Sequence, residues 1–212
     1  MDQTLEVRWF YDGTPPSTVV DWFMDLDPEQ ESEREDLYLI SNDPSLNVKL
    51  REEKIQLKRQ SGERTGAQFH DRVRGHREFW QKWSFPLTDG APDLFTEDPS
   101  GLWLPVTKSR YQRKYKPAEQ RSLLDPLVEP DPADALVELT QVTSGPHRAW
   151  TICMEAEGRA EVLPGTLRQM GLYVFNQGTP PALEPARSYG YVHWLEQAYV
   201  DGASALTNGM EG

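Results

Sequence analysis

The sequence predicts an α+β fold, an antiparallel β-barrel with a charged interior and with helices packed on its outside. Two observations lead to this fold class. Several segments alternate with period two between polar and apolar residues, as strands with one polar face and one apolar face do. The apolar faces carry large side chains that need cover, and helical segments are available to cover them from outside. The polar faces must then fill the interior of the closed sheet.

Each expected element follows from a local pattern. In the first segment, Thr4, Glu6 and Arg8 share one face opposite three apolar side chains. Ser17 is suited to cap a helix that presents apolar residues in helical spacing. We predict strands at residues 4–9, 36–40, 47–51, 54–58, 67–73, 77–85, 104–115, 135–143 and 148–157, helices at 17–24, 159–172 and 191–200, and acidic or proline-rich connections at 27–35, 86–101 and 116–134.

Length and composition favour one folded domain over residues 1–212, with barrel strands over about 3–158 and C-terminal helices over 159–205. A chain of 212 residues can bury one substantial core. Its mean hydropathy of −0.68 is low for a globular protein. Seven Trp, eight Tyr and seven Phe are nevertheless too many for a disordered chain, so we expect a folded protein with many polar positions to accommodate.

The charge distribution restricts the classes of partner. A net charge of −12 disfavours a nucleic-acid duplex as partner, because phosphate contacts supply most of the affinity of duplex-binding proteins. Basic residues still outnumber acidic ones between residues 49 and 116, whereas both flanks are acidic. The sequence has no apolar run that could span a membrane and no signal-peptide pattern, so we expect a cytoplasmic protein without a membrane partner. The single cysteine, Cys153, agrees with a reducing compartment.

The polar strand faces repeatedly carry two like charges at positions i and i+2. These pairs are Lys49 with Arg51, Lys108 with Arg110, and Glu155 with Glu157. In an ordinary half-solvated sheet such faces point to water, and this interpretation stays open. In a closed barrel they point inward, which is costly without a ligand. Paired cations opposite paired carboxylates suit a polyphosphate with Mg²⁺ or Mn²⁺, because cations match phosphate oxygens and carboxylates hold hard divalent ions.

A set of short segments stands in a characteristic order along the chain: TLEVR at 4–8, DLYL at 36–39, VKLR at 48–51, LKR at 57–59, EFWQKW at 78–83, VTKSR at 106–110 and MEAE at 154–157. In this order, over about residues 3–160, they resemble the CYTH family of triphosphate tunnel metalloenzymes. The resemblance implies an eight-stranded antiparallel tunnel, open at both ends, that binds triphosphate groups with Mg²⁺ or Mn²⁺. Members of the family include inorganic triphosphatases, thiamine-triphosphatases, RNA triphosphatases and class IV adenylyl cyclases.

The resemblance also implies roles for particular residues. Glu6, Glu155 and Glu157 would hold the metal; Lys49, Arg51, Lys58, Lys108 and Arg110 would bind phosphate; and Arg8 and Lys82 are the candidate catalytic cations. Lys82 equally fits an ordinary surface lysine.

The first-strand motif departs from the family's pattern. The family has Glu-x-Glu-x-Lys there, whereas this chain has Thr4-Leu5-Glu6-Val7-Arg8. Thr4 is neutral, and Arg8 stays charged near neutral pH and cannot act as a general base.

The leading hypothesis is metal-dependent hydrolysis of an inorganic or small organic triphosphate, which would make the protein a phosphoric anhydride hydrolase. Because Thr4 supplies no carboxylate, the alternative is a non-catalytic protein that binds a phosphorylated or otherwise anionic ligand. Either way the partner is a small phosphate-rich molecule. Nucleotide cyclisation would need a base-recognition site that we do not locate in the sequence, and a lipocalin-like barrel for an apolar ligand would need the charged faces to point outward.

Overall fold

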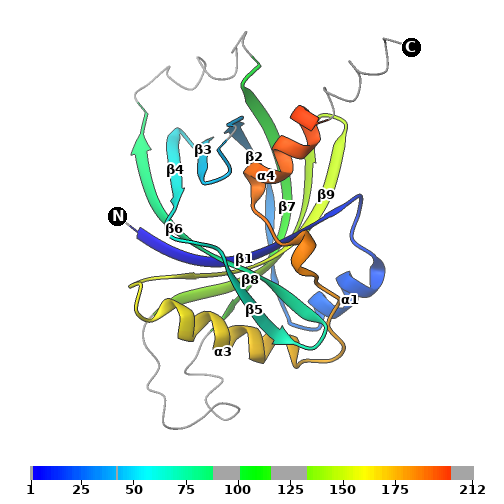
Figure 1. The fold of residues 1–212 in the computed structure, drawn as a ribbon. Helices are drawn as coiled ribbons and strands as arrows, with labels where there is room; N and C mark the ends of the chain where they lie inside the picture. Colours follow the sequence, from blue (N-terminus) through cyan, green and yellow to red (C-terminus); the bar gives the residue numbers. More distant parts are fainter. Residues whose placement is uncertain (1, 42, 88–100, 116–132, 202–212) are drawn as a thin grey trace, which may run out of the picture.

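The computed structural model describes residues 2–41, 43–87, 101–115 and 133–201 (Figure 1). Its strands are β1 (Asp2–Asp12), β2 (Glu29–Leu39), β3 (Leu46–Arg51), β4 (Lys54–Gln60), β5 (Thr65–His70), β6 (Val73–Pro86), β7 (Trp103–Tyr115), β8 (Asp134–Ser144) and β9 (His147–Glu157). Its helices are α1 (Ser17–Met24), α3 (Leu163–Phe175) and α4 (Tyr191–Glu196), with a 3₁₀ turn η2 (Pro185–Arg187) and a π-helical turn η3 (Gln197–Asp201).

Eight of these strands close into an antiparallel barrel. Their order is β1-β9-β8-β7-β2-β3-β4-β6, and β1 pairs with β6 to complete the ring. The long strand β6 takes part in two sheets: its first residues, 73–77, pair with β5 outside the barrel, and residues 78–86 pair with β1 and β4. The predicted α+β fold with an eight-stranded antiparallel barrel is therefore confirmed.

The main hydrophobic core lies outside the barrel. The apolar faces of β1, β8 and β9 pack against α1, α3 and β5, which lie together at one end of the view in Figure 1. Phe175 of α3 is central to this packing, since the ring of Trp22 stacks on it and the ring of Trp9 meets it edge-on. Two of the three expected helices thus cover the barrel from outside, as the apolar strand faces require.

Helix α4 lies in a different place, at one end of the barrel interior. The inward-facing side chains are apolar at this end, and Phe10 stacks against the rings of Tyr189 and Trp194 at centroid distances of 5.7 and 5.5 Å. The sequence led us to expect this helix on the outside with the other two. The CYTH resemblance implies a tunnel open at both ends, whereas here aromatic residues of α4 and the segment before it fill this end.

The first half of β2 corrects the acidic loop expected at residues 27–35. The structure has a strand from Glu29, and this strand pairs with β7 through a register shift between Glu31 and Arg34. The segment lacks apolar alternation, which is why the sequence pattern missed it. Its strand conformation depends on the backbone partners that β7 supplies.

Two other element boundaries differ from expectation. The strand expected at 67–73 ends at His70, and β6 begins at Val73. The helix expected at 159–172 is α3, which begins at Leu163 and ends at Phe175, and Pro164 lies in its first turn, where its missing N–H group is not needed. Most of the connections expected at 86–101 and 116–134, and residues 202–205 of the expected C-terminal helices, lie outside the described residues.

No helix in the described ranges has the length and apolar character needed to cross a membrane.

Substitution of a glycine in α3 tests how this helix packs on the outside of the barrel. A Cβ atom at Gly171 would overlap the ring of Phe69, whereas a Cβ atom at the exposed Gly165 of the same helix would meet nothing within 4 Å. We expect Gly171→Ala to lower the free energy of unfolding by about 1–3 kcal/mol through overpacking. Gly165→Ala should instead raise it by about 0.5–1 kcal/mol. Urea unfolding measures both, and equal effects of the two variants would contradict this packing.

Candidate functional site

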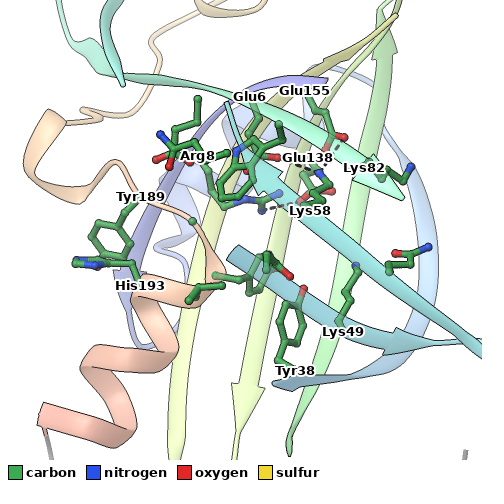
Figure 2. Close-up of a pocket in the computed structure, with 18 of the residues that line it drawn as sticks. Glu6, Arg8, Tyr38, Lys49, Lys58, Lys82, Glu138, Glu155, Tyr189 and His193 are labelled. Atoms are coloured by element: carbon green, nitrogen blue, oxygen red, sulfur yellow. Dashed lines mark hydrogen bonds and ion pairs between the residues drawn. The ribbon is translucent and has the colours of Figure 1, made fainter. Parts of the chain in front are cut away.

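A cavity of about 530 Å³ lies inside the barrel (Figure 2). The basic side chains that line it are Arg8, Arg34, Lys49, Arg51, Lys58, Arg64, Lys82, Lys108 and Arg110, and the carboxylates are Glu6, Glu78, Glu138 and Glu155. The polar strand faces therefore point inward rather than to solvent. Cations outnumber carboxylates in this lining although the whole chain has a net charge of −12.

The carboxylate of Asp36 holds one group of these cations. The side chain is 0% exposed, and its Oδ2 atom lies 2.6 Å from Lys108 Nζ and 3.3 Å from Lys49 Nζ. Arg51 donates to it through Nε at 2.9 Å and Nη2 at 3.2 Å. Arg34 Nε lies 3.8 Å from Oδ1. Lys49, Arg51 and Lys108 therefore share this one carboxylate, which leaves an excess of positive charge on the tunnel wall.

Burial and the excess of positive charge shift the pKa values of the charged groups around Asp36. Burial lowers the pKa of Lys108 to about 7, although Asp36 partly opposes the change. Burial, with the like charges of Lys108 and Arg51, also lowers the pKa of Lys49 well below its usual value. Burial alone would raise the pKa of Asp36, but the surrounding cations outweigh it and hold that pKa far below the usual range.

Aromatic groups complete the surroundings of Lys108. Its Nζ atom donates to the hydroxyl of Tyr38 at 2.6 Å and lies 4.2 Å from the ring centre of Tyr191, a cation–π distance. Tyr191 belongs to α4, so the helix that fills the end of the barrel also forms part of the cation site.

A second buried carboxylate, Glu138 of β8, holds the arginines. Arg8 Nη1 donates to it at 2.8 Å, Arg110 Nη1 at 3.3 Å and Gln112 Nε2 at 3.1 Å (Figure 2). Burial raises the pKa of Glu138, but the two arginines outweigh burial and hold it well below its usual range. The guanidinium of Arg8 also lies over the ring of Tyr191 at 4.8 Å. Arg8 is thus a fixed, charged group and not a proton acceptor.

Glu6 and Glu155 form the acidic part of the site. The register of β1 and β9 places them opposite each other, and Lys58 Nζ lies 3.4 Å from an oxygen of each (Figure 2). Burial raises the pKa of Glu155, but Lys58 outweighs burial and lowers it overall. Glu155 is therefore ready to hold a cation, and Glu6 lies opposite it.

The carboxylates of Glu6 and Glu155 fit one hard divalent cation. Potential ligand atoms of Glu6, Cys153 and Glu155 lie within 4.8 Å of one another. Burial raises the pKa of the Cys153 thiol well above its usual value, so this group stays protonated and is a poor ligand for Mg²⁺ or Mn²⁺. The two carboxylates are the suitable ligands, and the ammonium group of Lys58 now lies between them as a cation would.

The structure does not bring Glu157 together with Glu6 and Glu155. Glu157 does not line the cavity; it lies 3.7 Å from Lys82 Nζ and its side chain is 41% exposed. Lys82 does line the cavity, so it is not an ordinary surface lysine. Thr4, in the place of the family's first glutamate, is 0% exposed, and its hydroxyl has no hydrogen-bond partner among the described residues.

Several groups of the site were missed by sequence reasoning. Asp36, Glu78 and Glu138 are buried carboxylates in the tunnel wall; Glu78, Glu138, Arg34 and Arg64 line the cavity, and Asp36 lies behind its lining. The alternation of β8 was a usable signal for Glu138, because this residue shares the inward face with Thr140. Asp36 stood at the edge of a predicted strand, where its face is not defined.

Comparison with known proteins gives only structural likenesses. Neither a protein-family model nor a curated protein matches the sequence. The chain is similar to protein PH1819 of Pyrococcus horikoshii OT3, with a TM-score of 0.47 and 12% identity over 92% of this chain and 99% of that one. Protein PH1012 of the same organism gives 0.44 and 13% over 90% and 98%. A Bacillus halodurans protein described as a putative adenylate cyclase gives 0.34 and 15% over 87% and 96%.

Glu78 differs from the other buried carboxylates. It lies opposite Glu6 in the register of β1 and β6, and Arg64 Nε lies 2.8 Å from its Oε1 atom. Burial and the negative charge of Glu6 raise the pKa of Glu78 from 4.5 to about 7. The folded protein therefore binds this proton more tightly than the unfolded chain does.

This difference predicts a pH-dependent effect of Glu78→Gln. Because the folded-state pKa is raised, Glu78 makes the wild-type protein less stable as the pH rises from about 5 to above 7. The variant removes the ionisation, so it should match the wild type near pH 5 and exceed it by up to about 3 kcal/mol at pH 8. Loss of the Arg64 ion pair costs little, since that side chain is 40% exposed. Urea unfolding of the metal-free protein measures both values.

Glu138→Gln is the matched control in the same tunnel. Two arginines would lose their ionised acceptor, so this variant should be less stable than the wild type at pH 8 by about 2 kcal/mol. If Glu78→Gln gives no gain at pH 8 relative to pH 5, the raised pKa of Glu78 is contradicted.

Proposed function

We propose that the protein binds a triphosphate, inorganic or attached to a small organic group, inside the barrel and hydrolyses it with a divalent cation. The observation that carries the proposal is the excess of buried positive charge around Asp36, where Lys49, Arg51 and Lys108 share one carboxylate. Buried charge without a partner is costly, and phosphate oxygens would supply the missing anions. The ordered sequence resemblance to the CYTH family supports the same class of ligand.

The arrangement of cations suits an extended anion. Lys49 and Arg51 reach the cavity from β3, Lys108 and Arg110 from β7, and Arg8 from β1. A ligand in the cavity would therefore meet positive charge on several sides. The volume of about 530 Å³ lies in the range of sites for small molecules. The guanidinium groups can pair with phosphate oxygens through two parallel hydrogen bonds, and the lysines act as point charges.

The divalent cation would be held by Glu6 and Glu155. Mg²⁺ or Mn²⁺ bound there would neutralise charge on the phosphate oxygens and orient the attacking water. Lys58 neutralises both carboxylates in this structure. If these carboxylates held a metal ion, the ammonium group of Lys58 would be available to a phosphate oxygen.

The chemistry does not depend on a lysine at position 8. Phosphoryl transfer passes through a loose transition state, and its catalysis consists mainly of positioning and electrostatic stabilisation. Arg8 is held by Glu138 and faces the cavity with a permanent charge, so it can stabilise charge that develops on the transferred group. Lys82 would contribute in the same way from β6. Arg8 and Lys82 are thus the proposed catalytic cations.

A second candidate function is non-catalytic binding of the same class of ligand. The observation that favours it is Thr4, which leaves the acidic side of the site without the family's first carboxylate. With Glu157 lying apart, two carboxylates serve one metal ion less completely than a full family site would. Binding needs only the cation clusters and would survive this loss.

Phosphate release with Mg²⁺ or Mn²⁺ tests the proposal, using tripolyphosphate, thiamine triphosphate and ATP as substrates. We expect the wild type to release phosphate from at least one of them, and Glu155→Gln and Lys108→Ala each to lower kcat/KM at least tenfold through loss of a metal ligand or a phosphate contact. Lys114→Ala is the control, since this exposed lysine lies on the same strand as Lys108 but outside the cavity.

The outcomes separate the two functions. Tripolyphosphate binding without release by the wild type would favour the binding protein. Equal release by the wild type and both site variants would exclude the tunnel as the active site.

A further inference from the structure

Asp36 has a position that the proposed function does not explain. It contacts Lys49, Arg51 and Lys108, yet these three side chains line the cavity and Asp36 does not. The carboxylate thus lies behind the cations that would meet the ligand. We propose that Asp36 is a positioning residue that directs Lys49 and Lys108 into the tunnel and sets the pH range over which they stay charged, so that phosphate binding above that range is linked to proton uptake. This inference rests on the proposed binding of phosphate in the tunnel.

The position of β2 explains how one carboxylate reaches cations from two strands. β2 lies between β3 and β7, with Tyr38 paired to Lys49 on one side and Arg34 paired to Lys108 on the other. Asp36 stands between these two positions, and both of its oxygens accept hydrogen bonds from the cations. An asparagine there would keep the size of the side chain, but it would lose the charge and replace one acceptor by an N–H donor.

The charged surroundings of the two lysines make Asp36 decisive for their protonation. Lys108 faces Asp36, Arg34 and Tyr38 of β2, Arg51 of β3 and Tyr191 of α4; Lys49 faces Asp36, Lys108, Arg51 and Lys58, with the Tyr38 ring 5.7 Å away. Burial raises the pKa of both tyrosines, which therefore stay neutral. Among these groups, Asp36 is the anion that opposes the loss of a proton from either lysine.

The cluster around Glu138 provides an internal contrast. Its cations, Arg8 and Arg110, carry guanidinium groups, which stay charged across the physiological pH range. The tunnel therefore contains one cation cluster whose charge depends on pH and a second whose charge does not. Of these two clusters, only the one around Asp36 should link ligand binding to proton uptake.

This contrast predicts how affinity depends on pH. A bound polyphosphate favours the charged lysines, so the protein should take up protons on binding, and its affinity should fall as the pH rises above about 7. In Asp36→Asn the lysines lose their carboxylate. The pH at which affinity falls should then move at least one unit lower, which corresponds to about tenfold weaker binding at pH 8, with recovery toward the wild-type value at pH 6.

Isothermal titration calorimetry of the full chain with metal-free tripolyphosphate, from pH 6 to pH 9, measures these changes. Titrations in buffers of different ionisation enthalpy report the protons taken up. The ligand's own ionisation is the same for every variant, so the comparison between variants isolates the protein groups. Glu138→Gln is the matched control, and its pH midpoint should equal that of the wild type because arginines do not titrate in this range.

The double variant Lys49→Arg/Lys108→Arg gives an independent readout if Asp36→Asn does not fold. Arginine at both positions should remove the lysines' contribution to the fall in affinity and to the proton uptake, and should leave only the smaller contribution of Glu78. An unshifted midpoint in folded Asp36→Asn, an equal shift in Glu138→Gln, or a wild-type profile in the double variant would overturn the role of Asp36. If the wild type binds no tripolyphosphate at any pH, the proposed function fails as well.

Discussion

Closure of the sheet between β1 and β6 is the constraint on which the rest of the structure depends. In a closed barrel every strand turns one face inward. The apolar faces of β1, β8 and β9 are committed to α1 and α3 on the outside. The polar faces must therefore meet in the interior, where charged groups are costly unless they are paired. The buried clusters around Asp36 and Glu138 follow from this constraint.

Pairing inside the barrel is incomplete, and this connects the fold to the proposed function. Asp36 neutralises part of the charge of Lys49, Arg51 and Lys108, and burial together with the neighbouring like charges lowers the pKa of both lysines. On the opposite side, Lys58 neutralises Glu6 and Glu155 in place of a metal ion. An anionic ligand would pair with the cations around Asp36, and a divalent cation would pair with Glu6 and Glu155. The stability of the ligand-free protein is thus lower than the same fold could reach with its site filled.

The sequence predicted the parts of this arrangement that depend on local alternation. Period two identified most strands and the inward faces that carry Lys49 and Arg51. The partners across the barrel were not predictable in the same way. The contact of Lys108 with Asp36 joins residues 72 positions apart, and it depends on strand order and stagger, which alternation does not encode.

The placement of α4 and the strand conformation of the first half of β2 do not follow from their sequence patterns. Helix α4 carries buried apolar residues as α1 does, yet it packs against inward-facing apolar residues such as Phe10 and Val106 at one end of the barrel. Nothing in the periodicity of α4 distinguishes this place from the outer surface. The acidic first half of β2 is a strand because β7 offers it hydrogen-bond partners. Only the three-dimensional structure reveals these two features.

The central claim is that the tunnel binds a phosphate-rich anion, and thermal unfolding with and without tripolyphosphate tests it most directly. Ligand at about 100 times its dissociation constant should add about 2.7 kcal/mol of stability, which raises the Tm of a protein of this size by about 5–10 °C. Lys108→Ala should reduce this rise. An unchanged Tm at millimolar tripolyphosphate, with and without Mg²⁺, would contradict the claim.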